Sequence, residues 1–349
     1  MHVPDGFIDA PTSAAAAVVA AGAVAVGLRG ARRELDERTA PLAGLVAAFV
    51  FAVQMLNFPV AAGTSGHLLG GALAAILVGP YTGVLCISVV LLMQAVLFAD
   101  GGITALGVNV VCMGVVGTVV AYAVFRGLVK VLPRSRRSAT AASFVAALLS
   151  VPAAALAFTL FYWVGGTTDI GIGKVAGAMV GVHLLIGVGE AAITAFTVGA
   201  VLAVRPDLVH GARGLARPLR LRVGGRLVEA PAGPAAAEPA ARRSPRRLWA
   251  AGLFVSLLLA GFVSFYASAS PDGLEKVAEE TGFADSATEH HSAGSPLADY
   301  GVADVADARL SGGLAGVIGV TATAVGGTAV FWAVRRRRSG GRTPAETSV

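Results

Sequence analysis

Residues 141–164 read AASFVAALLSVPAAALAFTLFYWV, a run without a single charged side chain. A transmembrane helix needs about 20 consecutive, mostly apolar residues to cross the hydrocarbon core of a bilayer, so this stretch predicts a membrane-spanning helix. The whole chain shares this character: of its 349 residues, 55% are hydrophobic and 14% are charged, and the mean hydropathy is +0.73. Soluble domains carry about 25% charged residues, so the composition indicates a membrane protein.

Apolar runs recur along the chain and divide it into nine predicted spans. They cover about residues 11–28, 42–58, a short third run that ends near 79–80, 84–98, 110–125, 141–164, 175–204, 248–267 and 310–334. We therefore expect an all-α polytopic membrane protein with a seven-helix core and two further transmembrane helices that flank a loop. The expected units are a core at 1–205, a linker at 206–247, a two-helix module at 248–334 with its loop at 268–310, and a basic tail at 335–349.

Basic residues gather in blocks between these spans, and an even number of spans separates each block from the next. The blocks lie at 29–38, 126–137, 205–226 and 335–338. Because such blocks mark the cytoplasmic side of a membrane, the linker and the C-terminal tail are expected inside the cell. The N-terminus, His67, the turn around Asp100 and the loop 268–310 are then expected outside. The net charge of +6 thus reflects topology, and we expect no nucleic-acid partner.

The segment that joins the predicted core to the module differs in composition from the loop between the two module helices. Residues 206–247 alternate arginine with glycine, proline and alanine, a composition that buries no core, so we expect a flexible tether. The loop 268–310 holds nine acidic residues against two basic ones, and its field attracts cations; salt screens such a field within about 8 Å. His290 and His291 in this loop could gather ions weakly together with Glu289, but we expect them to be solvated.

The first residues, MHVPDG at 1–6, carry three nitrogen donors that can chelate one metal ion. The Met1 amine and the amide nitrogen of His2 close a five-membered ring on an ion, and the amide and Nδ1 of His2 close a six-membered ring. Three nitrogens in one plane suit Ni(II) or Cu(II), and binding should weaken as pH falls because the amide must lose its proton. The alternative is a start methionine with a chance histidine beside it. We expect the mature chain to keep Met1, because basic residues are absent before the first span and Pro4 and Asp5 precede it.

His67 stands in the glycine-rich segment 61–71, which leads into the short third span. A loop that dips into the membrane here would present His67 to the chelate as a fourth nitrogen; alternatively, the histidine anchors the loop by hydrogen bonds. Gln94, Asp100 and Asn109 are polar residues near span ends. They are candidates for hydrogen bonds to the far ring nitrogen of a metal-bound histidine, for gating, or for holding helices together.

Glu190 lies inside the seventh predicted span, where an ionisable residue is a functional candidate. It could hold a loop, act in gating or contact a partner helix; as a carboxylate it suits harder ions, and we do not expect it to be a ligand. His183, about two helical turns away, is expected to have its hydrogen bonds satisfied inside the bundle. Cys86 and Cys112 lie in apolar runs and are expected to be small buried hydrophobes.

Three separated motifs resemble those of the CbiM/NikM-type substrate-capture subunit of cobalt and nickel energy-coupling factor transporters. The motifs are MHVPDGF at 1–7, GTSGHLLGG at 63–71, and QA, FADGG and LGVN within 94–109. The resemblance covers about residues 1–205 and implies a seven-helix membrane protein with an external N-terminus. It also implies a divalent ion held by Met1, His2 and His67. The segment SPDGLE at 270–275 is similar to a signature of the accessory component found beside or fused to that subunit.

The resemblance implies a subunit that binds Co²⁺ or Ni²⁺ as transported substrate, without an organic cofactor. Its partners would be a transmembrane coupling subunit, cytoplasmic ATPases and membrane lipid, because the sequence has no G-x-x-x-x-G-K-[ST] loop of its own. Two alternatives remain open: a stand-alone secondary transporter or channel centred on Glu190, and a membrane sensor or scaffold whose loop 268–310 recruits a partner. The sequence does not choose between cobalt and nickel.

Overall fold

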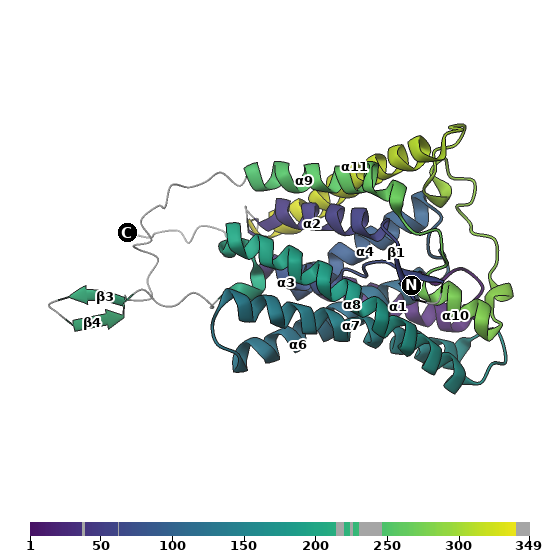
Figure 1. The fold of residues 1–349 in the computed structure, drawn as a ribbon, viewed down its shortest axis with the longest axis horizontal. Coiled ribbons are helices and arrows are strands. Elements are labelled where there is room, and N and C mark those ends of the chain that lie inside the picture. Colours follow the sequence, from purple (N-terminus) through teal and green to yellow (C-terminus); the bar gives the residue numbers. More distant parts are fainter. Residues whose placement is uncertain (37–38, 62, 214–219, 224–225, 230–245, 340–349) are drawn as a thin grey trace, which may run out of the picture.

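The computed structural model describes the chain apart from residues 37–38, 62, 214–219, 224–225, 230–245 and 340–349. The described chain is mainly helical, and its long helices run side by side in one bundle (Figure 1). Within the described ranges, seven helical segments are long and apolar enough to cross a membrane. The prediction of an all-α polytopic membrane protein is therefore confirmed.

The core helices follow the predicted spans closely. They are α1 (Ala10–Glu34), α2 (Thr39–Gln54), α3 (Gly71–Val78), α4 (Pro80–Leu97), α5 (Leu106–Asn109), α6 (Gly117–Val131), α7 (Arg136–Gly165) and α8 (Ile172–Val204). A π-helical stretch, Val110–Val116, joins α5 to α6. Two short antiparallel strands, β1 (Phe58–Ala61) and β2 (Thr64–Gly66), lie between α2 and α3.

The second part of the chain adds three helices and several short elements. The helices are α9 (Arg246–Gly261), α10 (Gly273–Thr281) and α11 (Ala308–Ser339). The short elements are 3₁₀ turns at Pro206–Leu208, His210–Ala212, Val263–Tyr266, Ala284–Ser286 and Ala298–Tyr300, and the hairpin of β3 (Arg220–Val223) and β4 (Arg226–Glu229).

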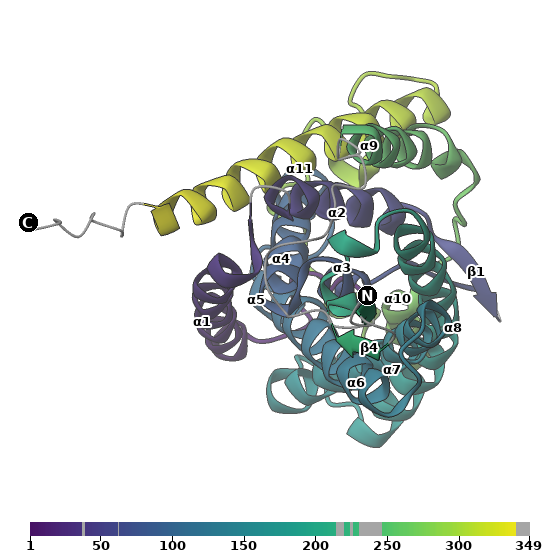
Figure 2. The same cartoon turned by 90° about the vertical axis from the view of Figure 1, so that its left-hand side faces the viewer.

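The third predicted span is a half-helix at the centre of the bundle. α3 has eight residues, all of them buried, so it rises about 12 Å and crosses less than half of a hydrocarbon core about 30 Å thick. Figure 2 shows α3 surrounded by other core helices. It begins after Gly70, whose φ of +85° favours glycine, and it ends at Gly79, because Pro80 starts α4.

Glu190 of α8 provides hydrogen-bond acceptors for backbone N–H groups at the start of this half-helix. Its carboxylate accepts hydrogen bonds from the backbone N–H of Leu69 at 2.7 Å and of Gly70 at 3.1 Å, and the Glu190 side chain is fully buried. The first N–H groups of a helix have no partner within the helix, and leaving them unpaired inside a membrane is costly. Of the roles considered for Glu190, the structure therefore places it in contact with the loop that carries His67.

The module helices pack against the outside of the core. α9 and α11 both lie on α2 (Figure 2). At this contact Gly319 approaches the ring of Phe51 so closely that a Cβ would lie 2.2 Å from its Cζ, and the indole N–H of Trp249 donates to the carbonyl of Pro41. Between α9 and α11 the chain crosses one end of the bundle. We call this end, which carries residues 1–8, the loop 57–70 and α10, the N-terminal face (Figure 1).

The linker expected at 206–247 is only partly described. Its first residues form the two 3₁₀ turns, and Gly211 packs so closely on the ring of Phe125 that a Cβ would lie 2.6 Å from it. The hairpin β3–β4 follows, apart from the bundle in Figure 1. Residues 214–219, 224–225 and 230–245 lie outside the described part, and the expectation of a flexible tether there stays a prediction.

The contact of Glu190 with the start of α3 predicts a loss of stability on substitution. In Glu190→Ala the N–H groups of Leu69 and Gly70 lose their acceptor, and each unpaired buried group costs about 1–3 kcal/mol. Glu190→Gln keeps one acceptor oxygen, so the melting temperature of the detergent-solubilised protein should fall less than in Glu190→Ala. The exposed Glu279 of α10 offers a control, Glu279→Ala, expected to melt like the unmodified protein. Equal melting temperatures for all variants would contradict this role.

Candidate metal centre

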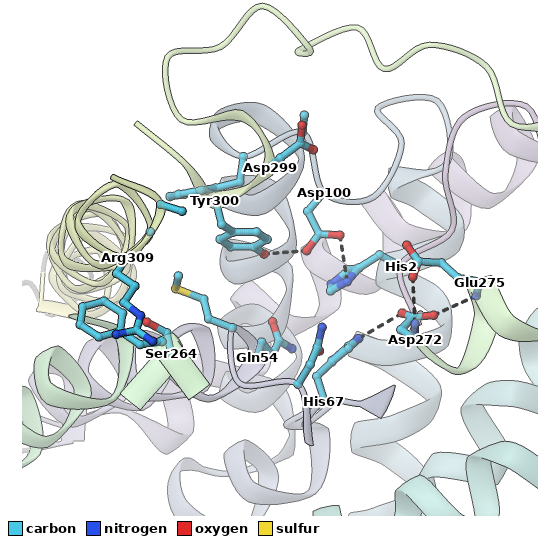
Figure 3. A pocket seen from close by; sticks show the side chains of 17 residues that line it. His2, Gln54, His67, Asp100, Ser264, Asp272, Glu275, Asp299, Tyr300 and Arg309 are labelled. Atoms are coloured by element: carbon cyan, nitrogen blue, oxygen red, sulfur yellow. Dashed lines mark hydrogen bonds and ion pairs between the residues drawn. The ribbon is translucent and has the colours of Figure 1, made fainter. Parts of the chain in front are cut away.

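Three parts of the chain meet at the amine of Met1 on the N-terminal face. The amine lies 2.6 Å from Nε2 of His67, in the loop before α3, and 2.6 Å from Oδ2 of Asp272, at the start of α10. His67 Nε2 and Asp272 Oδ2 are 3.6 Å apart. Met1 is buried, with 2% of its surface exposed. Figure 3 shows His67 and Asp272 directed toward each other. The predicted meeting of Met1 and His67 is thus observed.

The turn before α5 holds the N-terminal segment in place. Asn109 makes two hydrogen bonds with Val3: its Oδ1 accepts from Val3 N–H at 2.8 Å, and its Nδ2 donates to the Val3 carbonyl at 3.1 Å. The N–H of Gly102 also donates to this carbonyl. Asp5 accepts from the N–H and the hydroxyl of Thr104; burial raises the pKa of Asp5, but these hydrogen bonds outweigh it and hold the pKa below its usual value. The first five residues are therefore fixed by backbone and buried polar contacts.

His67 is oriented with one ring nitrogen available as an acceptor. Its Nδ1–H donates to the carbonyl of Leu68 at 3.0 Å, so Nε2 carries the lone pair that faces the amine of Met1. A histidine that binds a metal commonly donates its other N–H to a carbonyl or carboxylate in this way. The loop therefore presents His67 in the tautomer that a metal ion requires.

His2 lies beside His67 but is engaged elsewhere. The two imidazoles stack with centroids 4.9 Å apart and planes 11° from parallel. His2 Nδ1 lies 3.1 Å from Oδ1 of Asp100, and among the described residues its buried Nε2 has no hydrogen-bond partner. Burial lowers the pKa of His2 to about 4, although the charge of Asp100 opposes this. The ring is therefore neutral near pH 7, which suits metal binding, but Nδ1 must turn away from Asp100 to join a chelate.

Asp272 is the residue of this centre that the sequence analysis missed. It caps α10: Oδ1 accepts from the N–H of Leu274 and of Glu275, and the Glu275 side chain accepts from the N–H of Asp272. This reciprocal capping box leaves Oδ2 facing Met1 and His67. Burial alone would raise the pKa of Asp272, but the charge of the Met1 amine and the contact with His67 hold it well below its usual value.

Close packing fixes the start of α10 against the loop of His67. The N–H of Ser65 donates to the carbonyl of Pro271 at 2.9 Å, and the Ser65 hydroxyl donates to the carbonyl of Ser270 at 2.8 Å. Gly273 touches α8 so tightly that a Cβ would lie 2.6 Å from Cδ1 of Ile186. The Asp-x-x-Glu spacing in SPDGLE signals a helix start, but only the fold shows that its carboxylate faces a distant amine.

The remaining candidates form a second chain of contacts. Asp100 accepts from the hydroxyl of Tyr300 at 2.6 Å through its other oxygen, and Gln94 Nε2 donates to the same hydroxyl at 2.9 Å. The neighbouring negative charge and burial raise the pKa of Tyr300 well above its usual value, burial contributing most. Asp100 and Gln94 are thus connected to His2, whereas Glu190 lies below the loop and outside this contact chain.

His183 lies beside the centre rather than within it: a Cβ at Gly273, the residue after Asp272, would lie 3.1 Å from its Cε1. His183 donates from Nδ1 to the carbonyl of Met179 inside α8, but in the described chain its buried Nε2 has no hydrogen-bond partner, so the expectation that His183 is satisfied is met only for Nδ1. Cys86 and Cys112 are buried free thiols, as predicted. The expectation of a solvated pair in the loop is wrong for His290, which is partly buried and bonds the carbonyl of Gly101. It holds for His291, whose side chain is 67% exposed.

A cavity of about 580 Å³ adjoins the centre, between the core and the module. Its acidic lining residues come from both parts of the chain: Asp100 from the core, and Asp272, Glu275 and Asp299 from the module. Arg309 is the basic residue in its lining. A cleft lined mainly by one sign of charge concentrates ions of the opposite sign, so this cavity favours cations.

Side chains alone do not assemble a metal site here. Across the described ranges, three or more His, Cys, Asp or Glu side chains are nowhere grouped so as to hold an ion. A centre at this position therefore depends on the amine of Met1 and on backbone nitrogen, which is the chemistry that the N-terminal sequence offers.

Both parts of the chain match known protein families. Residues 2–208 match the family model CbiM, described as the cobalt uptake substrate-specific transmembrane region, and residues 246–336 match the PDGLE domain. The chain is similar to the fused nickel transport protein NikMN of Rhodobacter capsulatus, with 45% identity over 36% of each chain. It is also similar to the cobalt transport protein CbiM of Sorangium cellulosum, with 35% identity over 60% of this chain and 94% of that protein.

A solved structure shares the fold of the core. A crystal structure of a transition metal transporter superposes with a TM-score of 0.53 and 27% identity, and the match covers 58% of this chain and 93% of that one. The shared part therefore corresponds in extent to the core rather than to the module.

The two hydrogen bonds between Asn109 and Val3 lead to a prediction about the reactivity of the buried Met1 amine. In Asn109→Ala two hydrogen bonds to the N-terminal segment are lost, and acylation of the Met1 amine by a succinimidyl ester at neutral pH should be several-fold faster than in the unmodified protein. The modified N-terminal peptide can be quantified by mass spectrometry. Asn57→Ala, in the same cavity lining, is the matched control and should react at the original rate. An unchanged rate in Asn109→Ala would show that other contacts bury the amine.

Proposed function

We propose, on the premise that this chain belongs to the CbiM family of cobalt-uptake transmembrane proteins, that it captures Co²⁺ or Ni²⁺ with its own N-terminus for transport. One observation carries this proposal: the Met1 amine and His67 Nε2 lie 2.6 Å apart, buried beside a cavity with an acidic lining. Homologues that transport cobalt and homologues that transport nickel support both ions as substrates. The chain is then a transport component and not an enzyme.

Four nitrogens would hold the ion. The Met1 amine, the His2 amide and the His2 Nδ1 would form the two fused chelate rings, and His67 Nε2 would complete the square. The amine and the amide must release protons for this, whereas His2 is already neutral because of its burial. Turning Nδ1 of His2 toward the ion breaks its contact with Asp100. In this scheme Asn109 holds the N-terminal segment, and Asp100 and Gln94 hold His2 only until the ion binds; none of the three is a ligand.

The proposed orientation places the N-terminal face outside the cell. The basic blocks lie toward the opposite end of the bundle from Met1, and positive residues favour the cytoplasmic side. The acidic lining of the cavity would then draw cations from the exterior toward the amine. Residues 1–205 would form the capture domain and 248–334 the accessory module, with the linker and the C-terminal tail in the cytoplasm.

Energy for transport would come from other chains. We assign ATP hydrolysis to separate cytoplasmic subunits and the transmission of their motion to a transmembrane coupling subunit, as in energy-coupling factor transporters. The alternative of a stand-alone transporter centred on Glu190 has less support, because the carboxylate of Glu190 is occupied by the N–H groups of Leu69 and Gly70.

The chelate makes a direct prediction for metal binding. Protein purified in nanodiscs should bind Ni²⁺ or Co²⁺, and His67→Ala or His2→Ala should weaken binding by more than the 10–100-fold that is typical of losing an outer hydrogen-bond partner. Two residues inserted before Met1 should have the same effect, because they remove the amine from the site. Isothermal titration calorimetry measures the affinity.

The control for these variants is His210→Ala, since His210 lies in the 3₁₀ turn after α8, beside Tyr122, and its loss should leave the affinity unchanged. Undiminished binding in the His67→Ala protein or in the extended protein would refute capture by the N-terminus.

A further inference from the structure

We propose that Asp272 of the accessory module is itself a ligand of the captured ion, so that the module adds one oxygen to the four nitrogens of the core. This inference rests on the proposed function for the nitrogen set. It extends that set with a residue from the other part of the chain.

The distances among three donor atoms are those of ligands that share one ion. Two donors bound at about 2.0–2.1 Å are about 2.8 Å apart when they subtend 90° and about 3.6 Å apart when they subtend 120°. In the structure Met1 N lies 2.6 Å from both His67 Nε2 and Asp272 Oδ2, and the latter two atoms are 3.6 Å apart. Small adjustments would therefore let one ion contact all three atoms.

Oδ2 of Asp272 is the oxygen in position to bind. The capping box occupies Oδ1 and holds the residue through Leu274 and Glu275. In the described chain, the contacts of Oδ2 are with Met1 and His67. The docking of Pro271 on Ser65 and of Gly273 on Ile186 fixes the backbone on either side. The carboxylate is thus presented to the centre as rigidly as the two nitrogens that it faces.

Charge balance favours coordination of the ion by the Asp272 carboxylate over movement of this carboxylate away from the site. Asp272 is 9% exposed, and its cationic partner in the structure is the amine of Met1. An ion that binds the amine takes the place of the amine's protons, so the carboxylate would lose its counter-charge at that moment. A buried carboxylate without a partner is costly, whereas a divalent ion at the same point supplies the missing positive charge.

The proposal changes the expected coordination of the ion. Four nitrogens in a plane give square-planar Ni(II), which is diamagnetic, whereas a fifth, oxygen ligand gives a paramagnetic five-coordinate ion. Oxygen ligands suit harder divalent ions, so a carboxylate ligand should also raise the affinity of the site for Co²⁺. The module would thereby influence which ion is held.

The test uses the full chain in nanodiscs, loaded with Ni²⁺ alone. We expect X-ray absorption spectra of the unmodified protein to show five ligands, and magnetic susceptibility to show a paramagnetic ion. Asp272→Ser and Asp272→Asn both retain an N-cap acceptor for α10 but remove the carboxylate. In both, we expect a yellow, diamagnetic, four-coordinate ion and an affinity at least about tenfold lower. Asp304→Asn, which removes an exposed carboxylate of the same loop outside the cavity lining, should behave like the unmodified protein.

The outcomes separate this proposal from the one on which it rests. A diamagnetic four-nitrogen ion in the unmodified protein overturns the role of Asp272 and leaves the nitrogen chelate standing; this measurement does not depend on any variant folding. Spectra of Asp272→Ser and Asp272→Asn identical to that of the unmodified protein also overturn it. If the unmodified protein binds Ni²⁺ no better than His67→Ala does, the capture function itself fails.

Discussion

A positively charged chain terminus buried in a membrane protein must find partners, and the N-terminal face is arranged around that requirement. The Met1 amine is satisfied by an imidazole from the core and a carboxylate from the module, at 2.6 Å each. Because removing either would leave a buried charge poorly compensated, this single nitrogen ties together three segments that are far apart in the sequence. The candidate metal centre consists of the same atoms, which would surround a metal ion that replaces the amine's protons.

The core supplies rigidity beneath this centre. His67 stands just before a half-helix that is buried on every side, and the carboxylate of Glu190 holds the intervening backbone. Asn109 fixes the N-terminal segment from the other side through Val3. An imidazole and an amine held in this way lose little freedom when they bind an ion, and preorganisation of this kind favours affinity. The non-helical backbone between α2 and α3, described at 57–61 and 63–70, lies where such backbone is tolerated in membrane proteins, against protein and a cavity.

The module contacts the centre at two points, one beside each candidate histidine. Asp272 reaches the amine next to His67, and Tyr300 holds Asp100, which in turn contacts His2. The cavity beside the centre is likewise lined by residues of both parts. Movement of the segment between α9 and α11 would therefore change both the access to the centre and the orientation of His2.

The sequence by itself determined the class of the fold, the approximate limits of its long apolar helices, and the meeting of Met1, His2 and His67 on one face, but not that the third of its nine predicted spans is only a half-helix. Apolar run length and the placement of arginine decide these properties, and both are local features of a sequence. Only the tertiary structure decided that Asp272 lies on the Met1 amine, that His2 rests on Asp100, that Glu190 caps the half-helix and that His290 is partly buried. Each of these depends on packing between segments distant in the chain, for example the fit of Gly273 against Ile186. Hydropathy and the placement of basic residues predict at which end of a span a residue lies. They do not predict which side chains contact each other at that end.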